Sequence, residues 1–155
     1  MPRCFITGLN DEGRSTILRE DEISNAPSTA ESWGPLAWST AEVPADNDAF
    51  PDPGLRLNMD LIHSNASCFF LVRTPPGSRS EMHATETIDY ITMISGKLTF
   101  GVETGEASLS QGDLLIDRGI LHYWRNDSNE ESLHSVVTLP AHPLGTRRKD
   151  QPTVD

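Results

Sequence analysis

Two histidines and one aspartate are the residues of this sequence best suited to chemistry. Thr85 follows His83 at a spacing of two, and Trp124 follows His122 in the same way. Successive side chains of a β-strand point to opposite faces, so each of these pairs shares a face. Asp89 could add a carboxylate to the same site. Enclosed polar groups of this kind cost free energy unless a ligand, a metal or water satisfies them.

Three interpretations of this set stay open. His83, Asp89 and His122 could hold a divalent metal (Fe, Mn or Zn), because two imidazoles and a carboxylate leave coordination positions for substrate, water or oxygen. They could instead transfer protons without a metal, because an imidazole titrates near neutral pH and a carboxylate can tune it. They could also form a satisfied internal network in a protein that only binds a ligand.

Four further side chains are candidates for substrate binding. Thr85 shares the face of His83, although its hydroxyl is a poorer metal ligand than an imidazole. Arg118 could hold an acidic or phenolic group, and Tyr90 or Trp124 could stack on a ring.

Other histidines and tryptophans of the chain are expected to have structural roles. We expect His63 and His134 to be surface or packing residues, and Trp33 and Trp38 to pack in the core or at its rim. There is no glycine-rich phosphate-binding loop, so a nucleotide cofactor is not predicted.

Alternation of apolar and polar residues dominates the chain and predicts an all-β fold. Short strands are expected around residues 5–7, 15–18 and 36–39, with a proline-rich loop over residues 42–54. From residue 66 the pattern strengthens, beginning with an apolar run over residues 68–72 that is typical of a strand buried on both faces. Turn residues then separate six more segments: 90–95, 98–103, 107–109, 114–117, 121–125 and 133–139. Strands at this regular spacing indicate a sandwich or barrel.

Two segments resemble the paired motifs of the cupin superfamily. The first motif of cupins has a glycine, five residues, His-x-His, three or four residues, a glutamate, six residues and a glycine. Gly77, His83 and Gly96 occupy the corresponding places, Thr85 replaces the second histidine, and Asp89 replaces the glutamate.

The second cupin motif has a glycine, five residues, Pro-x-Gly, two residues, a histidine, three residues and an asparagine. Gly112, Gly119, His122 and Asn126 match it, while Arg118 replaces the proline and the spacing before it is one residue shorter. Gly96 and Gly112 are expected to flank tight turns.

This resemblance implies a single cupin barrel, a double-stranded β-helix or jelly roll, over residues 66–140. Residues 1–65 are expected to add strands and a loop across one edge, and residues 141–155 to form a loosely attached tail. The sequence pattern His-x-Thr-x-Thr-Ile-Asp-Tyr is similar to that of small cupins from secondary-metabolite clusters. The resemblance therefore implies an enzyme that dehydrates, isomerises, cyclises or decarboxylates a polyketide-type carbonyl compound. Its alternatives are an Fe(II)-dependent oxygenase and a non-catalytic small-molecule binder.

Composition narrows the possible partners. The chain has 155 residues and a net charge of −11, with 23 acidic and 12 basic residues, which disfavours binding to nucleic acid. No apolar run is long enough for a membrane span, and the N-terminus lacks the features of a secretory signal. Cys4 and Cys68 have no paired spacing, so we expect reduced thiols in a cytoplasmic protein. An uncovered sheet edge would favour a homodimer.

Overall fold

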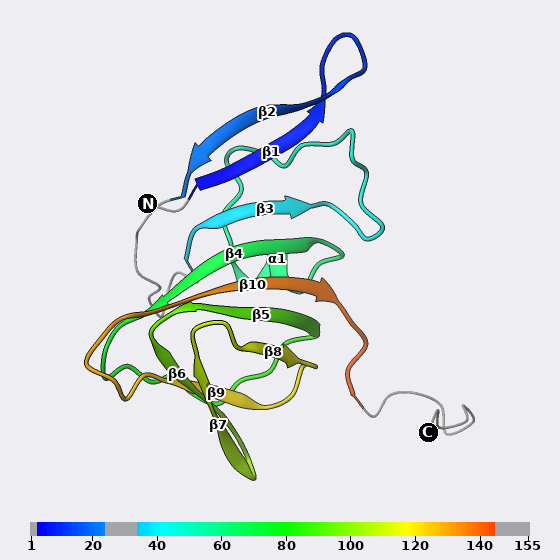
Figure 1. The fold of residues 1–155 in the computed structure, drawn as a ribbon. Helices are drawn as coiled ribbons and strands as arrows, with labels where there is room; N and C mark the ends of the chain where they lie inside the picture. Colours follow the sequence, from blue (N-terminus) through cyan, green and yellow to red (C-terminus); the bar gives the residue numbers. More distant parts are fainter. Residues whose placement is uncertain (1–2, 24–33, 145–155) are drawn as a thin grey trace, which may run out of the picture.

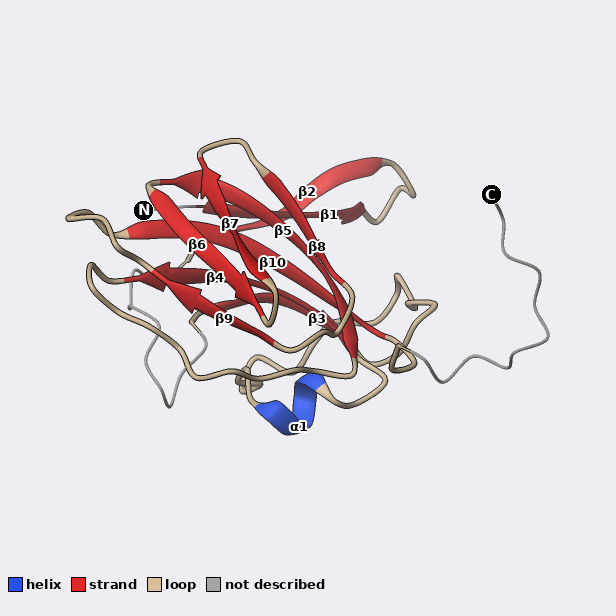
Figure 2. Cartoon of the chain, turned by 90° about the horizontal axis from the view of Figure 1, so that it is seen from below, coloured by secondary structure: helices blue, strands red, loops and turns tan. Residues whose placement is uncertain are grey.

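The computed structural model describes residues 3–23 and 34–144, and almost all the regular structure there is strand (Figures 1 and 2). The elements are β1 (Arg3–Leu9), β2 (Ser15–Glu22), β3 (Leu36–Thr40), α1 (Met59–Ile62), β4 (Ser67–Thr74), β5 (Thr87–Ser95), β6 (Lys97–Val102), β7 (Gly105–Ser110), β8 (Leu114–Asp117), β9 (His122–Arg125) and β10 (Ser132–Pro140). Within these residues α1 is the one helix, and it is far too short and polar to cross a membrane.

The strands form three antiparallel sheets. The largest has the order β3-β4-β10-β5-β8, the second has the order β7-β6-β9, and β1 and β2 pair as a separate hairpin. Figure 1 shows the three-stranded sheet on the opposite side of the large sheet from this hairpin. Strands distant in sequence are neighbours, as expected for a jelly roll: β10 lies between β4 and β5.

The inner face of the large sheet follows from alternation along its strands. On β10, every second residue from Ser132 to Thr138 is buried, and on β5 the buried positions include Thr87, Ile91 and Met93. Two residues that pair directly on neighbouring strands point to the same side of the sheet, so the inward-facing residues form rows across the strands. These rows form one wall of the space between the two larger sheets.

Two apolar clusters close the interior at different levels. One contains Phe70, Ile91 and Val136 of the large sheet, and the other contains Met93, Leu98 and Phe100. Leu115 and Trp124 pack against both clusters. The two clusters lie at neighbouring levels of the interior, since Ile91 and Met93 are two residues apart on β5, and Asp89 lies on the other side of Ile91.

The predicted strands are all present, with several longer than expected. In the N-terminal segment, β3 pairs with β4 at the edge of the large sheet, whereas β1 and β2 pair with each other. Residues 42–54 are a loop, and Trp38 packs edge-on against Phe50 with ring centroids 5.7 Å apart.

Several smaller expectations can also be compared with the structure. Gly96 and Gly112 both have positive φ, as their turns require. Cys4 and Cys68 form no disulfide with any described residue, and burial raises the pKa of the Cys68 thiol. Trp33 and residues 145–155 lie outside the described residues.

Candidate active site

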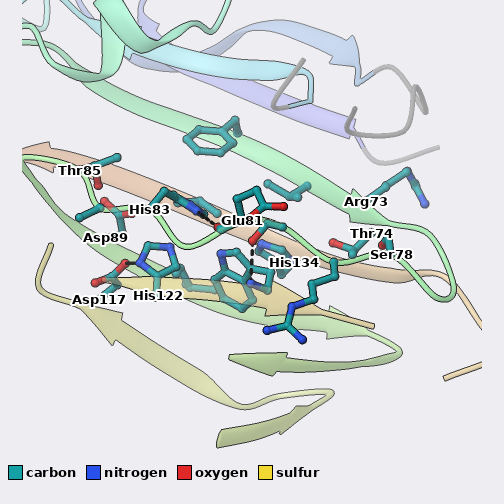
Figure 3. A pocket seen from close by; sticks show the side chains of 18 of the residues that line it. Arg73, Thr74, Ser78, Glu81, His83, Thr85, Asp89, Asp117, His122 and His134 are labelled. Atoms are coloured by element: carbon teal, nitrogen blue, oxygen red, sulfur yellow. Dashed lines mark hydrogen bonds and ion pairs between the residues drawn. The ribbon is translucent and has the colours of Figure 1, made fainter. Parts of the chain in front are cut away.

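A cavity of about 590 Å³ lies between the two larger sheets. Its volume is within the range of small-molecule sites, roughly 300–1,000 Å³. Strands β4, β5, β8, β9 and β10 contribute to its wall, together with the segment between β4 and β5. Figure 3 shows Asp89, Asp117, His83 and His122 toward one end, Arg73 and Ser78 toward the other, and His134 between them.

His83 and His122 meet on this cavity. The two residues form a β-bridge in which each backbone N–H donates to the other's carbonyl oxygen at 2.9 Å. Their ring centroids are 4.3 Å apart, and both side chains line the cavity. The structure thus brings together the two imidazoles singled out in the sequence, although they lie 39 residues apart.

Backbone contacts define the tautomer of both rings. His83 Nδ1 lies 2.8 Å from the carbonyl oxygen of Glu81, and His122 Nδ1 lies 2.9 Å from that of Ile120. A carbonyl oxygen only accepts hydrogen bonds, so Nδ1 carries the proton in each neutral ring. Nε2 is then the atom of each ring with a lone pair for a proton or a ligand.

Asp117 lies behind His122 and was not identified from the sequence. Its Oδ1 accepts hydrogen bonds from the backbone N–H groups of Gly119 and Ile120, at 3.0 and 3.3 Å. Its Oδ2 is 3.1 Å from His122 Nδ1 but has no hydrogen bond of acceptable geometry among the described residues, since the Nδ1 proton points to Ile120. Asp117 therefore acts on His122 through its charge more than through a hydrogen bond.

The short turn after β8 makes this arrangement possible. Gly119 has φ of +72°, and a Cβ atom built there would be 2.6 Å from the carbonyl oxygen of Thr85. Only glycine fits both the backbone conformation and the close approach. Asp117 ends β8 in the large sheet and His122 begins β9 in the three-stranded sheet, so the turn brings these two residues of different sheets to the same interior.

Burial and charge act on His122 in opposite directions. Burial lowers the pKa of His122 most strongly, and the nearby His83 lowers it further. The Ile120 carbonyl and the Asp117 carboxylate raise the pKa, but their combined effect is smaller. The net result is a pKa below the usual 6.5, so His122 is neutral at pH 7 and can accept a proton at Nε2.

Asp89 faces the cavity at the end of a chain of hydroxyl groups. Thr85 Oγ1 and Thr87 Oγ1 are 2.7 Å apart, and Thr87 donates to Asp89 Oδ1 at 2.7 Å. The pKa of Asp89 is raised to about 6, mainly because burial disfavours the charged form; the Thr87 hydrogen bond opposes this shift, and the charge of Asp117 adds to it. Asp89 and Asp117 are directly paired across β5 and β8, which explains their mutual effect. A carboxyl with this pKa can both give and take protons near neutral pH.

Two of the predicted substrate-binding residues do line the cavity. Thr85 is buried there, and Trp124 packs edge-on to Phe100 with ring centroids 4.9 Å apart. Tyr90 and Arg118 are not among the residues that line it, so a role for them in substrate binding stays a prediction. Each follows an inward-facing aspartate on its strand or turn, and alternation directs Tyr90 outward, where it is 44% exposed.

His134 is a cavity residue that the sequence analysis assigned to the surface or to packing. It is 3% exposed and stacks on Trp124, with ring centroids 5.0 Å apart. Its two-residue spacing from the buried Val136 was the available signal, because both positions alternate onto one face of β10. His63, by contrast, is exposed as expected.

The donor set was tested against the metal site that the motifs imply. His83, Asp89 and His122 all line the cavity. However, no three His, Cys, Asp or Glu side chains within residues 3–23 and 34–144 converge closely enough to hold a metal ion. The predicted set of three protein ligands is therefore not formed by these side chains.

Comparison with known proteins agrees with this architecture. Residues 70–138 match the Cupin_2 family model, described as a cupin domain. Phomopsin biosynthesis cluster protein C′ of Diaporthe leptostromiformis is 40% identical over 122 residues, which cover 70% of this chain and 61% of that protein. This chain thus spans less than two thirds of that relative's length. The cupin-domain-containing oxidoreductase srdB of Neurospora crassa is 28% identical over 145 residues, covering 89% of this chain and 72% of the relative.

A solved structure supports the fold alone. It is an uncharacterised conserved protein with a double-stranded β-helix domain from Klebsiella pneumoniae, with a TM-score of 0.53 and 19% identity. The match covers 75% of this chain and 83% of that one. Motifs, sheet order and the domain match lead to one conclusion: residues 70–138 of this chain are a cupin domain.

Proposed function

We propose that this protein is a small-molecule tailoring enzyme of secondary metabolism that moves protons on a carbonyl compound. The observation that carries the proposal is one cavity lined both by a buried carboxyl with a pKa of about 6 and by a neutral imidazole. The printed name of the relative from Diaporthe, a biosynthesis cluster protein, supports the metabolic setting. Dehydration, isomerisation, cyclisation and decarboxylation all need such a pair of groups.

The proposed reaction begins with two coupled proton transfers. Protonated Asp89 donates its proton to the carbonyl oxygen of the substrate, and His122 Nε2 takes a proton from the neighbouring carbon. The C–H electron pair becomes the C=C bond of an enol, and the carbonyl π pair forms the new O–H bond. Asp117 lies 3.1 Å from His122 Nδ1 and stabilises the imidazolium that forms.

The return of both protons completes an isomerisation. With an unsaturated ketone whose enol is conjugated to a second C=C bond, the imidazolium of His122 donates to the far carbon of that bond and the enol O–H returns its proton to Asp89. The double bond thus moves along the chain, and no proton is gained or lost overall. His83 lies against His122, with ring centroids 4.3 Å apart, and lines the same cavity. With a β-hydroxy ketone, the hydroxide leaves as water with the proton of the His122 imidazolium, and the enol O–H returns its proton to Asp89, which gives dehydration. With a β-keto acid, the C–C electron pair released with carbon dioxide becomes the C=C bond of the enol while Asp89 protonates the carbonyl oxygen, which gives decarboxylation.

Deuterium exchange tests this proposal without knowledge of the natural substrate. Aryl methyl ketones and 1,3-diketones that bind the protein, as detected by tryptophan fluorescence, are incubated with it in D₂O. We expect NMR to show deuterium at the carbon next to the carbonyl, with the rate reduced at least 100-fold by Asp89→Asn and by His122→Asn. Exchange that is absent for every bound ketone, or unchanged in both variants, would contradict the proposal.

A redox reaction is the second candidate, because the Neurospora relative is named an oxidoreductase. The two imidazoles of His83 and His122 are the protein groups that would take part in holding an iron ion for it. Elemental analysis after anaerobic loading with Fe(II) separates the candidates. Stoichiometric iron lost in both His83→Ala and His122→Ala would favour the oxidoreductase, and iron that does not exceed the level of those variants would favour proton transfer.

A further inference from the structure

The cavity has a second polar position, at His134, which is separated from Asp89 along the large sheet. Three consecutive rows of inward-facing residues of the large sheet cross this wall of the cavity. The row that contains Asp89 includes Thr138 and Asp117, the middle row includes Phe70, Val136 and Ile91, and the third row includes Val72, His134 and Met93. His134 is therefore the polar member of a row in which both direct neighbours are apolar.

The spacing between the polar rows follows from strand geometry. Thr138, which pairs with Asp89, is four residues from His134 on β10. At about 3.3 Å per residue, the two rows are roughly 13 Å apart. Val136 lies between them and belongs to the apolar cluster that also contains Phe70 and Ile91. Along this wall of the cavity, the polar row with Asp89 is therefore followed by an apolar row and then by the row with His134.

The imidazole of His134 is enclosed without the partner that such a group normally has. The side chain is buried, and its Nδ1 makes no hydrogen bond with any described residue. Burial lowers the pKa of His134 to about 4, so the ring is neutral at pH 7 and can donate one hydrogen bond and accept another. Trp124 covers one ring face, which leaves the in-plane edge as the direction for a polar contact.

An unsatisfied buried polar group is rare in folded proteins, because it loses its hydrogen bonds to water and gains none. A purely structural histidine at this position would be expected to contact a backbone or side-chain group. A leucine would pack equally well between Val72 and Met93 without this cost. The combination of burial, an orphan nitrogen and a place in the cavity wall is what a ligand contact would explain.

We propose that His134 is a substrate-binding residue that receives a hydroxyl or similar hydrogen-bonding group at the far end of an elongated, mostly apolar carbonyl compound. The carbonyl of the same molecule lies near Asp89 and His122, and its apolar middle lies against Phe70, Ile91 and Val136. This inference rests on the proposed function for the placement of the carbonyl. It adds the substrate class: a conjugated or aromatic ketone or aldehyde with a hydroxyl group about 1 nm from the carbonyl.

A matched pair of fluorescent ketones tests the inference by binding alone. The probes are 6-hydroxy-2-acetylnaphthalene and 6-methoxy-2-acetylnaphthalene, which differ in the ability of the distal oxygen to donate. Fluorescence anisotropy with wild-type protein is expected to show about 3- to 10-fold tighter binding of the hydroxyl compound, the effect of one net hydrogen bond. His134→Leu is expected to reduce this ratio to less than 2, and His134→Gln, which keeps an amide donor and acceptor, to retain part of it.

The control is His63→Leu, which changes an exposed histidine and should leave the ratio unchanged. Equal binding of both ketones by the wild type, absence of binding by either, or a full preference in a folded His134→Leu variant would overturn the inference. If the His134→Leu variant does not fold, the ¹⁵N chemical shifts of the His134 ring are measured in wild-type protein with each ketone. A change with the hydroxyl ketone but not the methoxy ketone supports the contact, and identical spectra refute it.

The same probes distinguish failure of this inference from failure of the proposed function. Selective binding through His134 with no deuterium exchange at the acetyl group would remove the proton-transfer proposal and keep the binding role. Deuterium exchange that depends on Asp89, together with equal binding of the hydroxyl and methoxy compounds, would keep the proton-transfer proposal and remove the binding role of His134.

Discussion

Replacement of Asp89 by asparagine is expected to stabilise the protein while it removes activity. The carboxyl has a pKa of about 6 in the folded protein against an ordinary 3.8, because burial disfavours its charge. The folded state therefore binds this proton more tightly than the unfolded state, and stability is lost as the pH rises from 3.8 to 6. The asparagine oxygen can still accept the hydrogen bond from Thr87, so the substitution removes the charge and keeps the contact.

The size of this effect follows from the shift in pKa. About 2.2 units at about 1.36 kcal/mol each correspond to a destabilisation of about 3 kcal/mol at pH 7.5. At pH 4, where the carboxyl is largely protonated in the folded state and about half protonated in the unfolded state, the same relation leaves about 0.6 kcal/mol. Asp89→Asn should thus gain about 3 kcal/mol at pH 7.5 and little at pH 4.

Urea denaturation at the two pH values measures both numbers. The midpoint should rise at pH 7.5 with an unchanged m-value, since the area exposed on unfolding stays the same. Asp11→Asn, in the exposed turn between β1 and β2, is the matched control and should shift the free energy of unfolding by less than about 0.5 kcal/mol at either pH. A gain of equal size at both pH values, or a loss at pH 7.5, would refute the reasoning that the Asp89 charge is buried at a cost.

The remaining predictions concern His122, the turn that precedes it, and assembly. Asp117→Asn keeps an acceptor for the Gly119 and Ile120 N–H groups but removes the charge behind His122. We therefore expect kcat to fall on the order of 100-fold with little change in KM. An unchanged kcat in steady-state assays would exclude the electrostatic role of Asp117. The value of kcat/KM should peak near or below pH 6, because Asp89 loses its proton above its pKa and His122 gains one below its lowered pKa, and Asp89→Asn should abolish the decline on the alkaline side. Gly119→Ala should lower Tm more than Gly112→Ala. Both glycines have positive φ, which costs about 1–3 kcal/mol of strain once a side chain is present, but of the two only Gly119 would place its Cβ against backbone oxygen. Equal losses of Tm in the two variants would contradict this. We also expect a homodimer in sedimentation velocity experiments, since β8 at one edge of the large sheet exposes Leu114 and Ile116. Substitution of both residues by glutamate should then give monomers. A wild-type monomer would contradict this expectation.

The sequence alone was sufficient for the fold and for one part of the site. Alternation of apolar residues and the position of turn residues are local signals, and they placed the strands that the structure contains. The two histidine motifs were recognisable because each is a short continuous segment with characteristic glycines. Alternation also indicated from the sequence that Tyr90 faces away from Asp89, because neighbouring residues on a strand point to opposite faces.

Asp117 and His134 required the tertiary structure. Asp117 becomes relevant because the glycine turn brings it to His122 and because β5 and β8 pair it with Asp89. His134 becomes a cavity residue because β10 lies at the centre of the large sheet, between strands that are distant from it in sequence. Register between such strands depends on packing of the whole sheet, and no local pattern determines it. For the same reason, the pKa of Asp89 could not be predicted from the sequence: it depends on burial and on a charge from another strand.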